Sequence, residues 1–113
     1  MDRDGFDQAC RTLPAVTMVV QWGESQVYKV GGKMFASLGV DDSLSVKCTE
    51  IAYRMLTEDE TGRRAPYSSG GNWLGLDRLD VIPDDDLRAL IAQSHALIAA
   101  RLTRAVRAEL GIG

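Results

Sequence analysis

The chain has 113 residues, of which 45% are hydrophobic and 26% are charged, and this predicts one globular domain spanning residues 1–113. A formal net charge of −3 and an isoelectric point near 5.0 argue against indiscriminate nucleic-acid binding, although they leave room for a local basic patch. No apolar run is long enough to span a bilayer and no signal segment opens the sequence, so we expect a cytoplasmic protein with no membrane partner.

The first predicted elements are a helix and a strand. Apolar residues recur at helical spacing over residues 2–12, with Asp2 or Asp4 placed to cap the helix and Pro14 placed to stop it. Residues 15–22 then alternate like a strand and are apolar on both faces in the middle. This pattern is typical of a strand that lies inside a sheet.

A tight hairpin is predicted next, with strands over residues 26–30 and 33–38. The turn is Gly31-Gly32, and glycine reaches the positive φ angles of a two-residue turn without steric cost. Counting back from this turn pairs Val30 with Lys33, Lys29 with Met34 and Tyr28 with Phe35. We therefore expect one face to carry Tyr28, Val30, Lys33 and Phe35, and the other to carry Lys29, Met34 and Ala36. The two hairpin lysines would then point to opposite faces.

The rest of the chain is predicted to hold a fourth strand over residues 43–48, a helix capped by Thr49, a loop over residues 57–72, a fifth strand over residues 73–79 and a long helix over residues 83–108. Short turns join the first four strands, so they pair antiparallel. The order αββββαβα predicts an α+β two-layer sandwich, in which helices cover one face of an antiparallel sheet of about five strands.

Charged residues mark both ends of the long predicted helix. Asp84, Asp85 and Asp86 stand where a helix favours acids, and we interpret them as capping residues. Arg101, Arg104 and Arg107 stand near its expected end, where they complement the helix dipole and favour solubility.

The sequence offers little support for an enzyme. His95 is the single histidine, and its neighbour Ser94 would point about 100° away around a helix, so the two cannot form a catalytic pair by themselves. An enzymatic function would instead need a deep polar pocket lined by His95, Trp73 and Tyr67. We therefore expect no enzyme and no cofactor.

The two cysteines are expected to be reduced and buried. Cys10 and Cys48 are 38 positions apart and belong to no Cys-x-x-Cys motif. A metal site would have to recruit both thiols together with His95, without any of the usual ligand spacings. We therefore expect no metal.

Basic side chains are the remaining candidates for a binding site. The candidate nucleic-acid-binding residues are Lys29, Lys33, Lys47, Arg63, Arg64 and Arg78. Two interpretations stay open at this stage. These residues either form an ordinary solvated surface or form a basic rim around the hairpin and the loop over residues 57–72.

Several short segments together resemble a known family. They are Leu13-Pro14, Trp22-Gly23, the run YKVGGKMFA over residues 28–36, SVKC over residues 45–48, Trp73, Asp86-Leu87 and Ser94. In this order they are similar to the MmcQ/YjbR family of small bacterial proteins. The resemblance implies a compact α+β domain, similar in fold to secretion chaperones, and brings no catalytic residues. The family is commonly labelled DNA-binding because its projecting hairpins have been likened to a double wing.

We therefore expect a non-enzymatic binding module of the MmcQ/YjbR type, with DNA as the leading partner and with the hairpin and basic loop as its contact surface. The alternative is a protein-interaction or chaperone-like adaptor, and a small-molecule enzyme is a third hypothesis. In either binding role we expect a monomer or weak dimer.

Overall fold

The computed structural model describes residues 1–66 and 71–112. Its elements in chain order are α1 (Arg3–Arg11), β1 (Val16–Gln21), β2 (Ser25–Val30), β3 (Lys33–Leu38), β4 (Leu44–Lys47), α2 (Glu50–Glu58), β5 (Arg63–Arg64), β6 (Trp73–Leu76), α3 (Asp84–Ala99) and α4 (Arg104–Leu110). The predicted order αββββαβα therefore gains a short strand, β5, and a final helix, α4.

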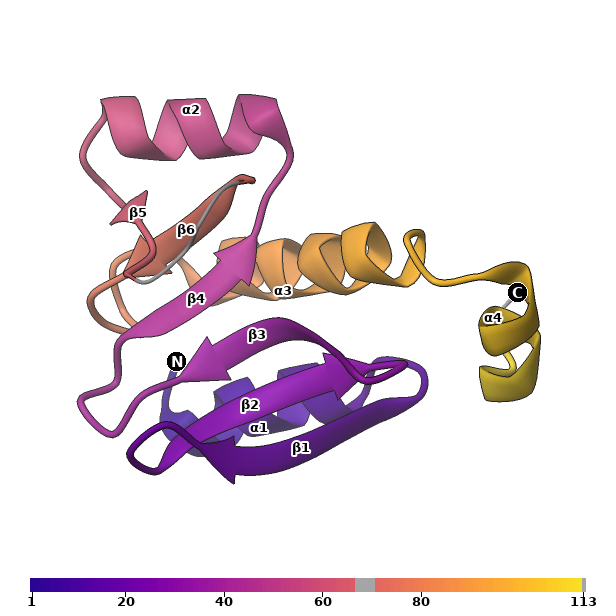
Figure 1. Cartoon of the computed structure of the whole chain (residues 1–113). Helices are drawn as coiled ribbons and strands as arrows, with labels where there is room; N and C mark the ends of the chain where they lie inside the picture. Colours follow the sequence, from indigo (N-terminus) through magenta and orange to yellow (C-terminus); the bar gives the residue numbers. More distant parts are fainter. Residues whose placement is uncertain (67–70, 113) are drawn as a thin grey trace.

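The six strands form one antiparallel sheet in the order β1-β2-β3-β4-β6-β5. Helices α1 and α3 lie against one face of this sheet, while α2 lies near the β6–β5 edge (Figure 1). The predicted α+β architecture, with helices on one face of an antiparallel sheet, is confirmed. We call the other face the open face.

The core lies between the sheet and helices α1 and α3. Phe6 of α1 packs edge-on against Tyr28 of β2, with ring centroids 5.7 Å apart, and both side chains are fully buried. The buried face of α3 is made by Leu87, Leu90, Ile91, Ser94, His95 and Ile98. Burial of this apolar surface is the main force that holds the two layers together.

The helix starts follow their predicted caps where a short polar side chain stands before the helix. The Asp2 carboxylate accepts a hydrogen bond from the Gly5 amide, and the Thr49 hydroxyl accepts one from the Ala52 amide. The acids at the start of α3 behave differently. The three acids lie in the first turn, where the helix dipole favours them as predicted, but the N-cap is Pro83 and no side chain caps the helix, so their interpretation as capping residues is wrong.

The hairpin register differs from the prediction at one residue. Lys29 pairs with Met34 and Val30 pairs with Lys33, as predicted. Tyr28, however, pairs with Ala36 and not with Phe35, because the register shifts between Tyr28 and Lys29. Phe35 is the additional residue of this β-bulge, which lets Phe35 and Ala36 both be fully buried. The predicted division of these side chains between the faces is therefore wrong for Ala36.

Ser94 of α3 occupies the place where β3 and β4 separate. Its hydroxyl donates a hydrogen bond to the Phe35 carbonyl and accepts one from the Lys47 amide at 2.9 Å. The pairing of β3 with β4 covers Ala36 to Leu38, so it stops short of Phe35. One buried serine thus satisfies two backbone groups that have no partner in the β3–β4 ladder.

The predicted long helix is interrupted. α3 ends at Ala99, and α4 begins at Arg104 after Thr103, whose hydroxyl accepts a hydrogen bond from the Val106 amide. Between them Leu102 is only 7% exposed and packs against the Gly31 turn. Burial of Leu102 against the Gly31 turn gives a physical reason for the break in the helix. A continuous straight helix would place the Leu102 side chain beyond this turn.

Both thiols are buried and free, as predicted. Burial raises the pKa of Cys48 to about 11 and raises the pKa of Cys10 further. Among the helices of the described residues, none has the length and apolar character needed to cross a membrane.

Candidate functional site

Most arginines of the described chain are neutralised by a nearby carboxylate. The ion pairs are Arg3 with Asp42, Arg11 with Asp7, Arg54 with Glu58, Arg63 with Asp77, Arg78 with Asp80 and Arg88 with Asp85. A second group of cations forms no ion pair within residues 1–66 and 71–112. We consider five of them: Lys29, Lys33, Lys47, Arg101 and Arg104.

These five cations come from elements that meet at one end of the molecule, which we call the basic end. A methyl group added at Gly31 would lie only 2.7 Å from Leu102, so the β2–β3 turn touches the turn between α3 and α4. Lys29 and Lys33 flank the first turn, while Arg101 and Arg104 flank Leu102. Figure 1 shows the β2–β3 turn and the end of α3 on the same side of the fold.

Lys47 connects the basic end to the open face of the sheet. Its ammonium lies over the Trp73 ring, 5.6 Å from the ring centroid. Burial lowers the pKa of Lys47, and repulsion from the Arg101 guanidinium lowers it further. The positive charge of Arg101 therefore affects the pKa of Lys47, although the two residues are far apart in the sequence.

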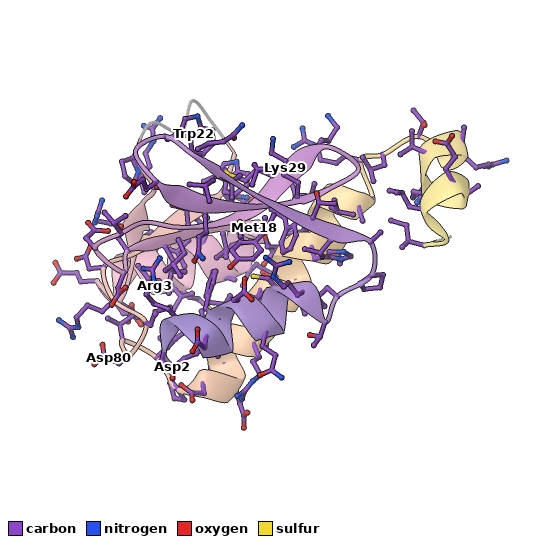
Figure 2. All side chains as sticks on the ribbon, turned by 90° about the horizontal axis from the view of Figure 1, so that it is seen from below. Asp2, Arg3, Met18, Trp22, Lys29 and Asp80 are labelled. Atoms are coloured by element: carbon purple, nitrogen blue, oxygen red, sulfur yellow. The ribbon has the colours of Figure 1, made fainter. Side chains whose placement is uncertain are left out.

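The two hairpin lysines point away from each other, as predicted. Lys29 and Trp22 lie on the open face, whereas Met18 points toward the helices (Figure 2). Lys33 is exposed at the start of β3 and pairs with Val30, whose side chain is buried on the helical side. The hairpin therefore presents one cation to each side of its tip.

The other predicted site residues lie elsewhere. Arg63 and Arg64 form β5 at the far edge of the sheet, and the Arg63 guanidinium is 2.7 Å from Asp77. Arg78 follows β6 and is 2.9 Å from Asp80. The structure thus brings Lys29, Lys33 and Lys47 toward one end and does not bring these three arginines with them.

Arg101 and Arg104 were assigned by sequence to the closing turn of a long helix. Arg101 lies in the turn after α3, and Arg104 begins α4, where the helix dipole disfavours a cation. The explanation from the dipole therefore fails for Arg104, whereas Arg101 directly follows the C-terminal cap of α3 and Arg107 stands in the last turn of α4, where cations complement the dipole. Thr103, a good helix-capping residue directly before Arg104, was the signal in the sequence that a new helix starts there.

The residues considered for an enzyme do not form one pocket. His95 is buried on the helical side, where its Nε2 lies 2.8 Å from the Pro14 carbonyl oxygen and its ring meets Phe35 edge-on. Trp73 lines a pocket on the open face. Tyr67 lies outside the described residues. No cluster of three or more potential metal ligands occurs in the part of the chain that the structure describes.

Comparison with protein families finds a match to the YjbR family over residues 11–97. This is most of the chain. The chain belongs to the YjbR family. The crystal structure of Deinococcus radiodurans protein DR2400, which carries the domain DUF419, is similar to this YjbR protein in fold, with a TM-score of 0.81. Its sequence is 24% identical, and the match covers 97% of this chain and 88% of that one. No curated protein matches the sequence significantly.

Proposed function

We propose that this YjbR protein is a non-enzymatic binding domain and that its basic end binds nucleic-acid phosphates. The observation that carries the proposal is the contrast between two groups of cations. Six arginines elsewhere in the described chain form ion pairs with carboxylates, whereas the five cations of the basic end have no carboxylate within ion-pair distance.

Cations left near one another repel, and an anion placed among them relieves that repulsion. Burial is the main cause of the lowered pKa of Lys47, and the smaller contribution from Arg101 is a local sign of this repulsion. Glu50 and Glu109 lie on α2 and α4, but neither forms an ion pair with these cations. A phosphate chain supplies negative charges at a spacing that several separate cations can contact together.

The net charge of −3 predicts that such binding is weak and sensitive to salt. Acidic groups elsewhere on the surface repel DNA at long range, and they do so most at low ionic strength. The local cations must therefore supply the attraction. This charge balance favours DNA contact at one end of the molecule over nonspecific DNA contact with its whole surface.

The test is binding to a short fluorescent DNA duplex, measured by anisotropy at about 50 mM salt, where phosphate contacts are strong. We expect the wild-type protein to bind and Lys33→Glu to bind at least several-fold more weakly. Arg78→Glu is the matched control, because it reverses the same charge at an exposed site away from the basic end.

Two results would contradict the proposal. One is no binding by the wild-type protein at this salt concentration. The other is an equal loss in Lys33→Glu and Arg78→Glu, because net charge alone would then explain the effect. Circular dichroism of each variant checks that the fold is retained.

A protein-binding function is a second candidate, and exposed apolar residues on α2 favour it. Ile51 and Met55 are 74% and 63% exposed and lie one helical turn apart. Affinity capture from nuclease-treated lysate should recover a defined partner with the wild-type protein, and Ile51→Glu should lose it. Capture that is unchanged by Ile51→Glu would count against α2 as the contact surface.

A further inference from the structure

The open face of the sheet contains a pocket of about 830 Å³ that the phosphate-binding proposal does not use. Its floor includes Ser37 of β3 and Ser45 of β4, which are adjacent partners in the sheet. Trp22, in the turn after β1, and Trp73, at the start of β6, line it at opposite ends, and Met34 adds a further apolar contact. Small side chains on the floor and large aromatic ones at the sides leave room for a flat ring.

Trp22 is held in an unusual way. Its φ angle is +52°, a left-handed conformation that a bulky side chain rarely adopts, and its side chain is 67% exposed. The positive φ belongs to the β1–β2 turn, since Gly23 and Glu24 after it also have positive φ angles, but hydrophobic burial does not explain the exposed indole ring.

Asp41, in the turn between β3 and β4, is the acidic residue in the lining, and cations lie beside the pocket at its other end. Lys47 lies over the Trp73 ring, and Lys29 pairs with Met34, so two residues of the basic end border residues that line the pocket. Trp22 and Lys29 lie on the same face of the sheet (Figure 2). A ligand that joins a flat aromatic ring to a phosphate would fit this combination of aromatic walls and adjacent ammonium groups.

We propose that this pocket binds nucleotide bases, which stack at Trp22 at one end and at Trp73 at the other, and that Lys47 holds the phosphate next to Trp73. The Trp22 and Trp73 rings provide surfaces for stacking, which accepts any base because every base has a π face. The hydroxyls of Ser37 and Ser45 can donate to or accept from the edge of the base. This inference rests on the proposed function, because Lys47 belongs to both sites.

The base can come from an unpaired strand or from a free mononucleotide. Paired bases are stacked inside the duplex, so they cannot enter a pocket on a sheet face unless they are displaced. A single strand offers an accessible base together with neighbouring phosphates, which could reach the other cations of the basic end. We therefore expect single-stranded nucleic acid to bind more tightly than the mononucleotide.

The experiment compares three fluorescence titrations of the wild-type protein at about 50 mM salt. The ligands are a twelve-residue oligothymidylate, an abasic sugar-phosphate chain of equal length and charge, and thymidine monophosphate. We expect the oligothymidylate to bind roughly 5- to 150-fold more tightly than the abasic chain, the range given by stacking of one base. Monophosphate binding as tight as that of the oligothymidylate would assign the pocket to free nucleotides.

Variants test whether Trp22 causes the difference in affinity between the oligothymidylate and the abasic chain. Trp22→Ala should weaken oligothymidylate binding by the same factor and leave abasic binding unchanged, whereas Trp22→Phe should retain most of the affinity. Val20→Ala is the control, because it also removes exposed apolar surface but lies on β1 and does not line the pocket.

Equal binding of the oligothymidylate and the abasic chain would overturn the base pocket and leave the phosphate site standing. Binding of neither chain would overturn the phosphate site of the proposed function itself. An oligothymidylate affinity that Trp22→Ala does not change would also contradict the pocket.

Discussion

At the scale of single residues, the two turn glycines show that a turn motif in the sequence does not reveal every tertiary contact of its residues. Gly31 and Gly32 both have positive φ angles, +58° and +79°, so both suit glycine for the same backbone reason. Only Gly31 also has a close neighbour, because Leu102 packs directly over it. Sequence reasoning found the turn but could not show that one glycine also receives a side chain from the other end of the chain.

Gly31→Ala should therefore destabilise the protein more than Gly32→Ala. Both substitutions place a methyl group on a left-handed residue, at a cost of about 1–2 kcal/mol. Gly31→Ala should add about 1–3 kcal/mol, because the new methyl group overlaps Leu102. Urea unfolding of the two variants measures the difference, and equal losses would show that Leu102 does not pack on this turn.

The Asp7 carboxylate should make stability depend on acid. Although desolvation by burial acts in the opposite direction, the hydrogen bond from Tyr28 and the ion pair with Arg11 lower the pKa of Asp7 below 3.8. A carboxylate with a lowered pKa stabilises the folded state above its unfolded pKa, and this contribution is lost as the pH falls through the folded pKa.

We expect the free energy of unfolding to fall between about pH 5 and pH 2, and to fall less in Asp7→Asn. The difference should be on the order of 1 kcal/mol or less, since Asp7 is partly exposed. Denaturant titrations at pH 5 and pH 3 provide the measurement. A pH dependence that is identical in the variant would exclude this role for Asp7.

At the scale of elements, sequence patterns predicted the helices and strands whose formation depends on local interactions. The first helix, the four meander strands and the helix after Thr49 were found, because spacing and caps are visible in the sequence. The Phe35 bulge and the break at Leu102 were missed, because both depend on contacts with distant elements. The two-residue strand β5 was missed because it carries no periodicity.

Ser94 is the residue through which α3 stabilises the point where β3 and β4 separate. Ser94→Ala should lower the free energy of unfolding by about 1–3 kcal/mol, because it leaves the Phe35 carbonyl and the Lys47 amide without a partner. Ser45→Ala is a suitable control, since this serine lies in the same sheet on the open face. Equal small losses in the two variants, measured by thermal or urea unfolding, would contradict the bridging role.

At the scale of the whole molecule, the distribution of charge matters more than its sum. The sequence identified three of the five cations of the basic end: Lys29, Lys33 and Lys47. It placed Arg101 and Arg104 on a helix end, because the turn that brings them to the hairpin is not visible in periodicity. A net charge of −3 coexists with this cluster because carboxylates neutralise cations elsewhere.

The salt dependence of DNA binding tests the central claim most directly, because its slope counts the phosphates that the protein neutralises. Five contacts by the basic end predict that log K falls with log salt with a slope of about −4.5 on duplex DNA. Lys33→Glu should make the slope shallower by about one, and Arg78→Glu should leave it unchanged. A wild-type slope near zero, or a slope equally altered in both variants, would contradict the basic end as a nucleic-acid site.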